Sequence, residues 1–124
     1  MARLIPAPSI IKAAGNKPKE IREYIGRVNS DTSGASIAQM ISPQGWEEPG
    51  QTPDFEEYTI VLRGKLQVET TNEILTINER QAFIAHKGEW VKYSSPFEGG
   101  AEYISVCLPA FSVETVNRDI DKNP

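Results

Sequence analysis

From Ser36 onward, the chain is a succession of short apolar or alternating runs separated by turn residues. No run has the length of a typical helix, and glycine, proline, asparagine and serine fill the gaps between runs. Regularly spaced short strands of this kind predict an all-β sandwich or barrel. The expected strands are residues 36–42, 57–64, 65–70, 73–78, 81–87, 90–96 and 101–111.

At 124 residues, the chain has the size of one domain with one hydrophobic core. We expect a single domain with its barrel core at about residues 36–111, an N-terminal segment over 1–35 and a polar tail over 112–124, whose last residues, 117–124, should fray. Ser9 is placed to cap a short helix that ends at Ala14, before Gly15. Residues 19–28 fit a helix or a strand equally well.

The charge pattern limits the kinds of molecule that the protein is expected to bind. The net charge is −4, and acidic and basic residues are interspersed, so we expect no nucleic-acid partner. The apolar runs are far shorter than a membrane helix requires, and residues 1–10 lack the features of a signal peptide. Cys107 is the single cysteine, which excludes an internal disulfide. We therefore expect a soluble cytoplasmic protein without a membrane partner.

The acidic stretch over residues 48–64 leads into one of the expected strands. Alternation places Glu57 on one face with Thr59 and Val61, while Tyr58 lies on the other face. If the face with Glu57 points inward, its carboxylate needs a cation, a donor or a proton, because an unpaired buried charge costs several kcal/mol. If that face points outward, Glu57 needs no partner, and the pattern leaves both orientations open.

Two motifs resemble those of the cupin superfamily. Glu57, followed after six intervening residues by Gly64, is similar to the second half of the first cupin motif. Residues 80–96 resemble the second motif, with Gly88 at its glycine and His86 where proline is usual. The resemblance covers residues 45–111 and implies a jelly-roll β-barrel, also called a double-stranded β-helix.

The sequence departs from the cupin motifs at the positions of the usual metal ligands. Metal-binding cupins carry a His-x-His pair that would fall within residues 50–53, and another histidine at the position of Val91. Only Glu57 of that ligand set is present, so we expect no conventional metal and assign no cofactor. A rearranged set that uses Glu57, His86, Glu47 or Glu48 stays open, although His86 is more simply explained as a hydrogen-bonded residue at a strand end.

The strongest local resemblance is to histidine-poor cupins such as the ethanolamine-utilisation Q protein. These share the glutamate, the apolar run and the glycine of EYTIVLRG, a serine-rich turn such as YSSP and a late strand such as CLPAF. Their shared loss of the histidine pair implies a pocket that works without the usual metal.

The expected pocket draws on several strands. The strand over residues 101–110 has one apolar face and one amphipathic face, so both should be covered, one by the barrel interior and one by a second sheet or a partner subunit. This favours a homodimer, which the resemblance also implies. Cys107 is expected to be a buried, inert thiol. The candidate ligand-binding residues are Glu57, Gln51, Tyr93, Tyr103 and Cys107, with Trp46 and Trp90 as a possible rim.

Three functions remain open from the sequence. The first is a module that binds a small polar or weakly cationic metabolite in the barrel without a metal. The second is an enzyme that acts on a sugar or small carboxylic acid, through an atypical metal site or with Glu57 as general base. The third is a structural or assembly protein whose barrel is filled by side chains.

Overall fold

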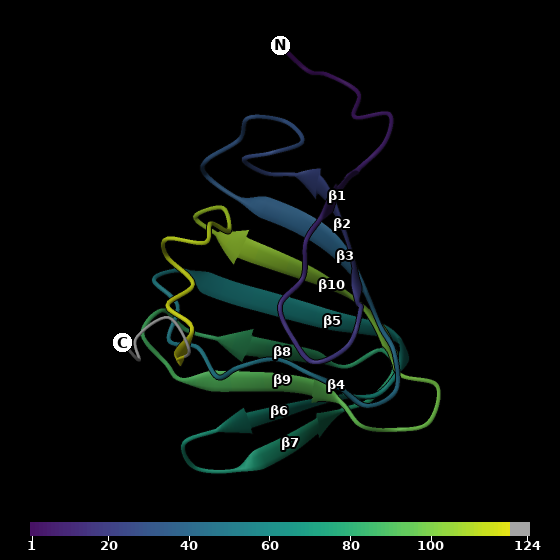
Figure 1. Ribbon diagram of the computed structural model, residues 1–124. Coiled ribbons are helices and arrows are strands. Elements are labelled where there is room, and N and C mark those ends of the chain that lie inside the picture. Colours follow the sequence, from purple (N-terminus) through teal and green to yellow (C-terminus); the bar gives the residue numbers. More distant parts are fainter. Residues whose placement is uncertain (120–124) are drawn as a thin grey trace.

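The computed structural model describes residues 1–119, which form two antiparallel sheets (Figure 1). The larger sheet has the order β1-β2-β3-β10-β5-β8, and the smaller one has the order β4-β9-β6-β7. The strands are β1 Ser9–Ile11, β2 Glu20–Ile25, β3 Ser36–Ser42, β4 Trp46–Glu47, β5 Glu56–Gly64, β6 Leu66–Thr70, β7 Ile74–Ile77, β8 Ala82–Ala85, β9 Val91–Ser95 and β10 Ala101–Leu108. The all-β jelly-roll prediction is confirmed, and all seven expected strands are present.

The core follows from the alternation of buried and exposed side chains along the strands. Val61 of β5, Leu66 and Val68 of β6, Val91 of β9 and Ala101 of β10 are almost completely buried between the two sheets. Toward the start of β5 and the end of β10, polar residues replace these apolar ones on the inner face. The barrel is therefore packed at one end and polar at the other. Within residues 1–119, no helix has the length and apolar character that a membrane crossing requires.

The predicted N-terminal helix is wrong. Ser9 begins strand β1, which pairs with β2 in the register Ser9↔Glu23, and its hydroxyl donates to Asn29 Oδ1 at 2.6 Å. A sheet edge offers the backbone a full set of hydrogen bonds, and this tertiary pairing outweighs the weak local preference for a cap. The segment that fitted either structure is also a strand, because β2 pairs with β3 on its other side.

Residues 12–19, between β1 and β2, cross in front of the large sheet and reach the small one (Figure 1). Asn16 N donates to the Glu47 carbonyl at 3.0 Å, and Trp46 Nε1 donates to the Ala14 carbonyl at 3.1 Å. These bonds fix the crossing segment, as we call residues 12–19, over the polar end of the barrel. The N-terminal part of the chain thus helps to enclose the interior.

The described part of the C-terminal tail is attached to the loop that precedes β5. Asp119 N donates to the Gly50 carbonyl at 2.8 Å, and Asn117 Nδ2 donates to the Thr52 carbonyl at 3.0 Å. Fraying was predicted for residues 117–124, of which residues 120–124 lie outside the described part of the chain.

Candidate functional site

A cavity of about 70 Å³ occupies the polar end of the barrel. By the same measure one water molecule needs roughly 10–15 Å³, so the cavity has room for several waters or a small organic molecule. The large sheet, the crossing segment and the loop before β5 all contribute to its wall. The polar and ionisable lining residues are Lys12, Lys19, Glu23, Ser36, Glu48, Gln51, Glu57, Tyr93, Tyr103, Ser105, Cys107 and Arg118.

Glu57 lies on the inner face of β5 and is only 8% exposed. The Tyr93 hydroxyl, from β9 on the opposite sheet, donates to Glu57 Oε1 at 3.0 Å. Burial raises the pKa of Glu57 above its ordinary value, while the hydrogen bond from Tyr93, the positive charge of Lys19 and a hydrogen bond with Ser105 oppose that rise. Glu57 thus faces the barrel interior, the orientation that the strand pattern left open, and Tyr93 reaches it from the opposite sheet.

Lys19 supplies a positive charge to the same cavity from the end of the crossing segment. Its Nζ donates to the Tyr103 hydroxyl at 2.7 Å and lies 3.9 Å from the centre of the Trp46 ring. The Tyr103 hydroxyl in turn lies 3.1 Å from Ser42 Oγ. Among the described residues, Lys19 has no carboxylate within ion-pair distance, so its remaining donors are available to a ligand.

Glu48 lies where the cavity opens to the surface. Together with Ala14 and Arg118, it lines both the cavity and a more open groove beside it, which makes this groove the entrance. Burial raises the pKa of Glu48 to about 7, and Glu57 adds to the rise, while Lys19 and Arg118 oppose it. A carboxyl group with this pKa exchanges a proton readily at neutral pH.

The seven predicted ligand-binding residues divide into two groups. Five of them line the cavity, namely Glu57, Gln51, Tyr93, Tyr103 and Cys107. The two tryptophans do not. Trp46 is 1% exposed and packs in the core, and Trp90 Nε1 donates to Asp119 Oδ2 at 2.9 Å, outside the cavity lining. Their large indole rings anchor the crossing segment and the tail, so the prediction of a tryptophan rim is not supported by the geometry.

Cys107 is a free cysteine that is 4% exposed. Burial raises the pKa of its thiol, and the negative charge of Glu57 adds to the effect. The thiol is therefore protonated at neutral pH, as expected for a buried structural cysteine.

The donor set does not fit the transition-metal site of metal-binding cupins. Val91, at the position of the missing histidine, is 1% exposed and has only an apolar side chain. Glu57 is then the only member of the usual ligand set, and it is neither an imidazole nor a thiolate. Among residues 1–119, no three His, Cys, Asp or Glu side chains lie close enough to hold a metal ion.

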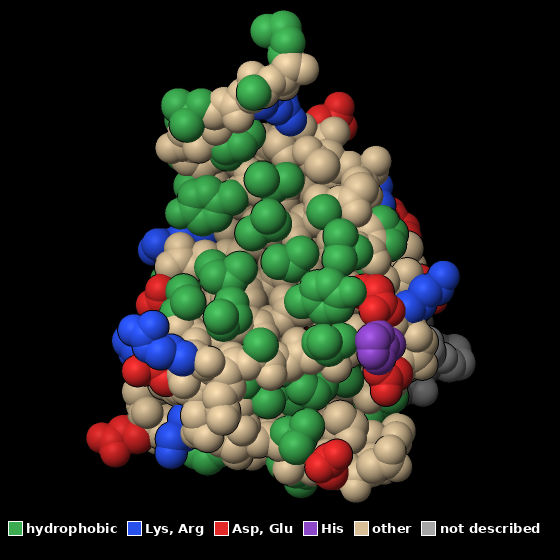
Figure 2. Space-filling model, turned by 180° about the vertical axis from the view of Figure 1, so that it is seen from behind, with side chains coloured by type: hydrophobic (Ala, Val, Ile, Leu, Met, Phe, Trp, Pro, Cys, Tyr) green, Lys and Arg blue, Asp and Glu red, His purple; other side chains and the backbone are tan. Residues whose placement is uncertain are grey.

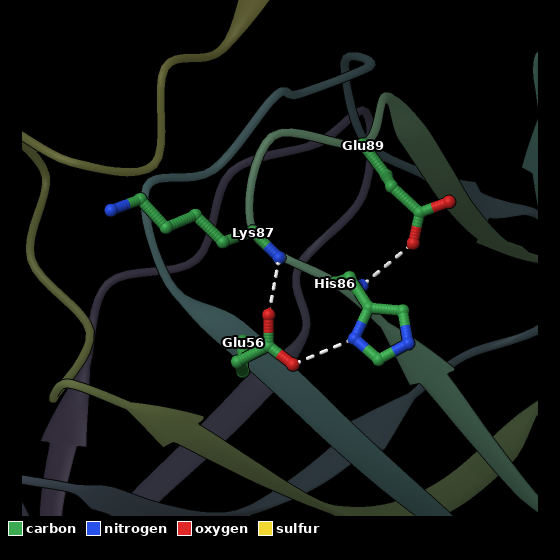
Figure 3. Close-up of polar contacts among 4 residues, drawn as sticks. All are labelled: Glu56, His86, Lys87 and Glu89. Atoms are coloured by element: carbon green, nitrogen blue, oxygen red, sulfur yellow. Dashed lines mark hydrogen bonds and ion pairs between the residues drawn. The ribbon is translucent and has the colours of Figure 1, made fainter.

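His86 does not contribute to a rearranged metal set with Glu57. His86 follows β8 on the outer side of the sheet, where its Nδ1 lies 2.7 Å from Glu56 Oε1, and its backbone N donates to Glu89 Oε1 at 2.8 Å (Figure 3). Lys87 N donates to the other Glu56 oxygen. Glu56 and Glu57 point to opposite faces of β5, as alternation predicts, so His86 does not share a site with Glu57.

Several lining residues were not among the predicted set. Ser105 lies between Tyr103 and Cys107 on the inner face of β10, so the alternation along that strand was a sufficient signal for it. Glu48 had been considered only as a metal ligand. Lys19 belongs to a segment whose secondary structure the sequence left open, and only the path of the crossing segment brings it to the cavity.

No family model matches the chain. The protein called endoribonuclease YbeY of Myxococcus xanthus is 36% identical over 104 residues, which are 84% of this chain and 35% of that protein. The chain therefore spans about a third of the length of this relative.

Solved structures share the fold at low sequence identity. An RmlC-like cupin from Shewanella frigidimarina superposes with a TM-score of 0.68 at 13% identity, covering 83% of this chain and 85% of that one. The protein has a cupin fold. A putative ethanolamine-utilisation protein Q from Salmonella typhimurium has a TM-score of 0.62 at 15% identity, over 84% of this chain and 97% of that cupin. The polyketide cyclase RemF from Streptomyces resistomycificus has a TM-score of 0.71 at 16% identity, over 94% and 84%.

Proposed function

We propose that this cupin binds a small polar or weakly cationic metabolite in the cavity without a metal. The observation that carries the proposal is Glu57, a buried carboxyl group that faces a cavity and has hydrogen bonds with Tyr93 and Ser105 but no ion-pair partner among the described residues. Burying an acid is costly unless its oxygens receive further donors or charge. A ligand that donates a hydrogen bond or brings a positive charge would supply what the protein leaves unfilled.

The charges around the cavity define the ligand further. Glu57 and Glu48 accept hydrogen bonds or positive charge, while Lys19 has donors left after its single bond to Tyr103. A ligand with a hydroxyl or amino group at one end and an acceptor at the other would satisfy both. The cavity volume limits this ligand to a few non-hydrogen atoms unless it extends through the entrance beside Arg118.

The test is a thermal-shift screen of small amines, polyols, amino acids and hydroxy acids against the full chain. A ligand at 100 times its dissociation constant stabilises the folded state by about 2.7 kcal/mol, which gives a measurable rise in Tm. Glu57→Gln should abolish the shift for the best compounds. The matched control is Glu56→Gln, which changes the adjacent acid on the opposite face and should leave the shift intact. A screen without any shift, or one in which Glu57→Gln preserves every hit, would count against the proposal.

One observation favours an enzyme as the second candidate. Glu48, with a pKa raised by burial to about 7, lies at the entrance of the same cavity as Glu57. Such a carboxyl group is suited to give or take a proton during a reaction on a sugar or small carboxylic acid. Nuclear magnetic resonance spectra of each screening hit, recorded over hours with the protein, distinguish the two candidates, because binding alone leaves the compound unchanged.

Two other functions receive less support. The presence of a cavity argues against a barrel that side chains fill completely. The endoribonuclease activity named for the Myxococcus xanthus protein is not transferred, because about two thirds of that protein lie outside the match and the net charge of this chain is −4.

A further inference from the structure

Two basic side chains, Lys19 and Arg118, line the cavity. Lys19 comes from the end of the crossing segment, and Arg118 comes from the described part of the C-terminal tail. Both positive charges lower the pKa of Glu48, so both lie near the entrance. Within residues 1–119, neither side chain has a carboxylate at ion-pair distance. We call them the cavity cations, and their charges are available to a ligand.

The protein holds Arg118 in place without satisfying its guanidinium group. The backbone of Arg118 forms a bridge with Gln51, another residue of the lining. Its Cζ lies 5.8 Å from the centre of the Phe111 ring. Its Nε is shielded from solvent, yet no described residue accepts a hydrogen bond from it. A buried N–H group without an acceptor costs free energy, which an acceptor on a bound ligand would recover.

Several other basic side chains are paired with acids or lie at the margin of the surface. Arg22 pairs with Glu20, and Arg63 Nε lies 3.6 Å from a carboxylate oxygen of Glu102. On the outer side of the large sheet, hydrophobic side chains predominate and the basic ones lie toward the margins (Figure 2). The cavity cations differ from these because they reach one cavity from two distant segments of the chain.

The acids of the cavity do not fully offset the cavity cations. Burial raises the pKa of Glu57, and it raises the pKa of Glu48 to about 7, so both acids take up a proton more easily than an exposed acid does. Glu23, the third acid of the lining, accepts hydrogen bonds from the backbone N of Val28 and Asn29 at 3.0 and 2.9 Å. The negative charge that opposes a bound anion is therefore smaller than the number of acids suggests.

We propose that the cavity cations form a carboxylate subsite, and that the ligand is a small amino acid or hydroxy acid whose carboxylate binds Lys19 and Arg118. This subsite rests on the proposed function, since it belongs to the same cavity and narrows the class of ligand. A planar carboxylate matches the fork of an arginine side chain and accepts the remaining donors of a lysine. The amino or hydroxyl group of the same molecule donates to Glu57.

The rest of the lining selects among anions. A phosphate group carries close to two negative charges at neutral pH, so Glu57 and Glu48 repel it more strongly than they repel a carboxylate. Ala38, Met40 and Phe55 give the cavity an apolar wall that suits a short aliphatic chain. The cavity volume of about 70 Å³ leaves room for only a few carbon atoms.

Thermal-shift titrations of the full chain with matched acids and amides test the subsite. The probes are glycolate, lactate, glycine and alanine, each beside its own amide, together with inorganic phosphate. An amide keeps the shape of the acid and replaces the charged carboxylate with a neutral group. Because hydrogen bonds to charged groups are the stronger ones, we expect at least one acid to bind about 10-fold or more tightly than its amide.

Substitution of the cavity cations should remove this preference. Lys19→Gln and Arg118→Gln should each weaken binding of the acid by about 10-fold and change binding of the amide much less. The matched control is Lys17→Gln. It neutralises another lysine of the crossing segment, whose Nζ donates to the Gln44 carbonyl at 3.0 Å outside the cavity lining, and it should keep the preference. Circular dichroism checks the folding of each variant, and Arg118→Gln decides the test if Lys19→Gln does not fold.

A failure of the subsite can be told apart from a failure of the proposed function. Acids and amides that raise Tm equally, or hits confined to amides, amines, polyols or phosphate, overturn the carboxylate subsite and leave a ligand-binding cavity. A preference for acids that survives both Lys19→Gln and Arg118→Gln also overturns the subsite, because the carboxylate then binds elsewhere. The absence of a shift with every probe and every compound of the wider screen overturns both.

Discussion

The replacement Glu48→Gln tests the electrostatics of the cavity entrance. It keeps the shape of the side chain and removes the ionisable group whose pKa burial raises from 4.5 to about 7. Because the pKa is higher in the folded state, ionisation of Glu48 costs stability: the penalty is absent below pH 4.5, grows as the pH rises and is complete above pH 7. At about 1.4 kcal/mol per pH unit, the full penalty is about 3 kcal/mol.

Urea denaturation at pH 5, 6, 7 and 8 measures this difference. Wild-type protein should lose stability relative to Glu48→Gln as the pH increases, by less than about 1 kcal/mol at pH 5 and by about 3 kcal/mol at pH 8. Glu47→Gln, which alters the exposed neighbouring carboxylate, is the control and should follow the wild type. Parallel pH profiles for wild type and Glu48→Gln would refute the conclusion that burial holds this carboxyl group near neutrality.

Two further predictions concern the turns and the outer surface. Gly64 has φ of 76°, and an added Cβ would lie 2.1 Å from a backbone oxygen, whereas Gly88 has φ of 86° with open space around it. Gly64→Ala should therefore lower the free energy of unfolding by more than Gly88→Ala does. The second substitution should cost only the roughly 1–2 kcal/mol of backbone strain. Equal losses of stability in urea denaturation would disprove the steric clash at Gly64. The hydrogen bond to Glu56 raises the pKa of His86 above 6.5, so its contribution to stability should be lost as the pH rises through that higher pKa. In a proton-resonance titration, Glu56→Gln should lower the pKa of His86, and an unchanged value would contradict the pairing.

Strand alternation predicted which side chains share a face of a strand, but it did not decide whether the face with Glu57 points into the barrel. Glu57, Tyr93 and Tyr103 were named as candidate ligand-binding residues, and all three line the cavity. Lys19 and Glu48 could not be placed there by the same reasoning. Both belong to irregular segments, where the two-residue period of a strand gives no information on side-chain direction.

The tryptophans illustrate the limit of reasoning from residue type. A large aromatic side chain with a polar nitrogen is equally suited to a ligand-binding rim and to an internal anchor. Trp46 and Trp90 became anchors because hydrogen-bond acceptors from distant segments, the Ala14 carbonyl and the Asp119 carboxylate, reach their indole nitrogens. Contacts between residues so far apart in the chain are set by the fold.

The sequence alone determined the strands, the side chains that share a face of each strand and the absence of the usual histidines, because these depend on local periodicity and on residue identity. The tertiary structure decided that Ser9–Ile11 is a strand and that residues 12–19 enclose the cavity. It also brought Lys19 and Glu48 beside Glu57. Those outcomes depend on which backbone groups form hydrogen bonds across the barrel and on how deeply each acidic side chain is buried. A short stretch of sequence determines neither.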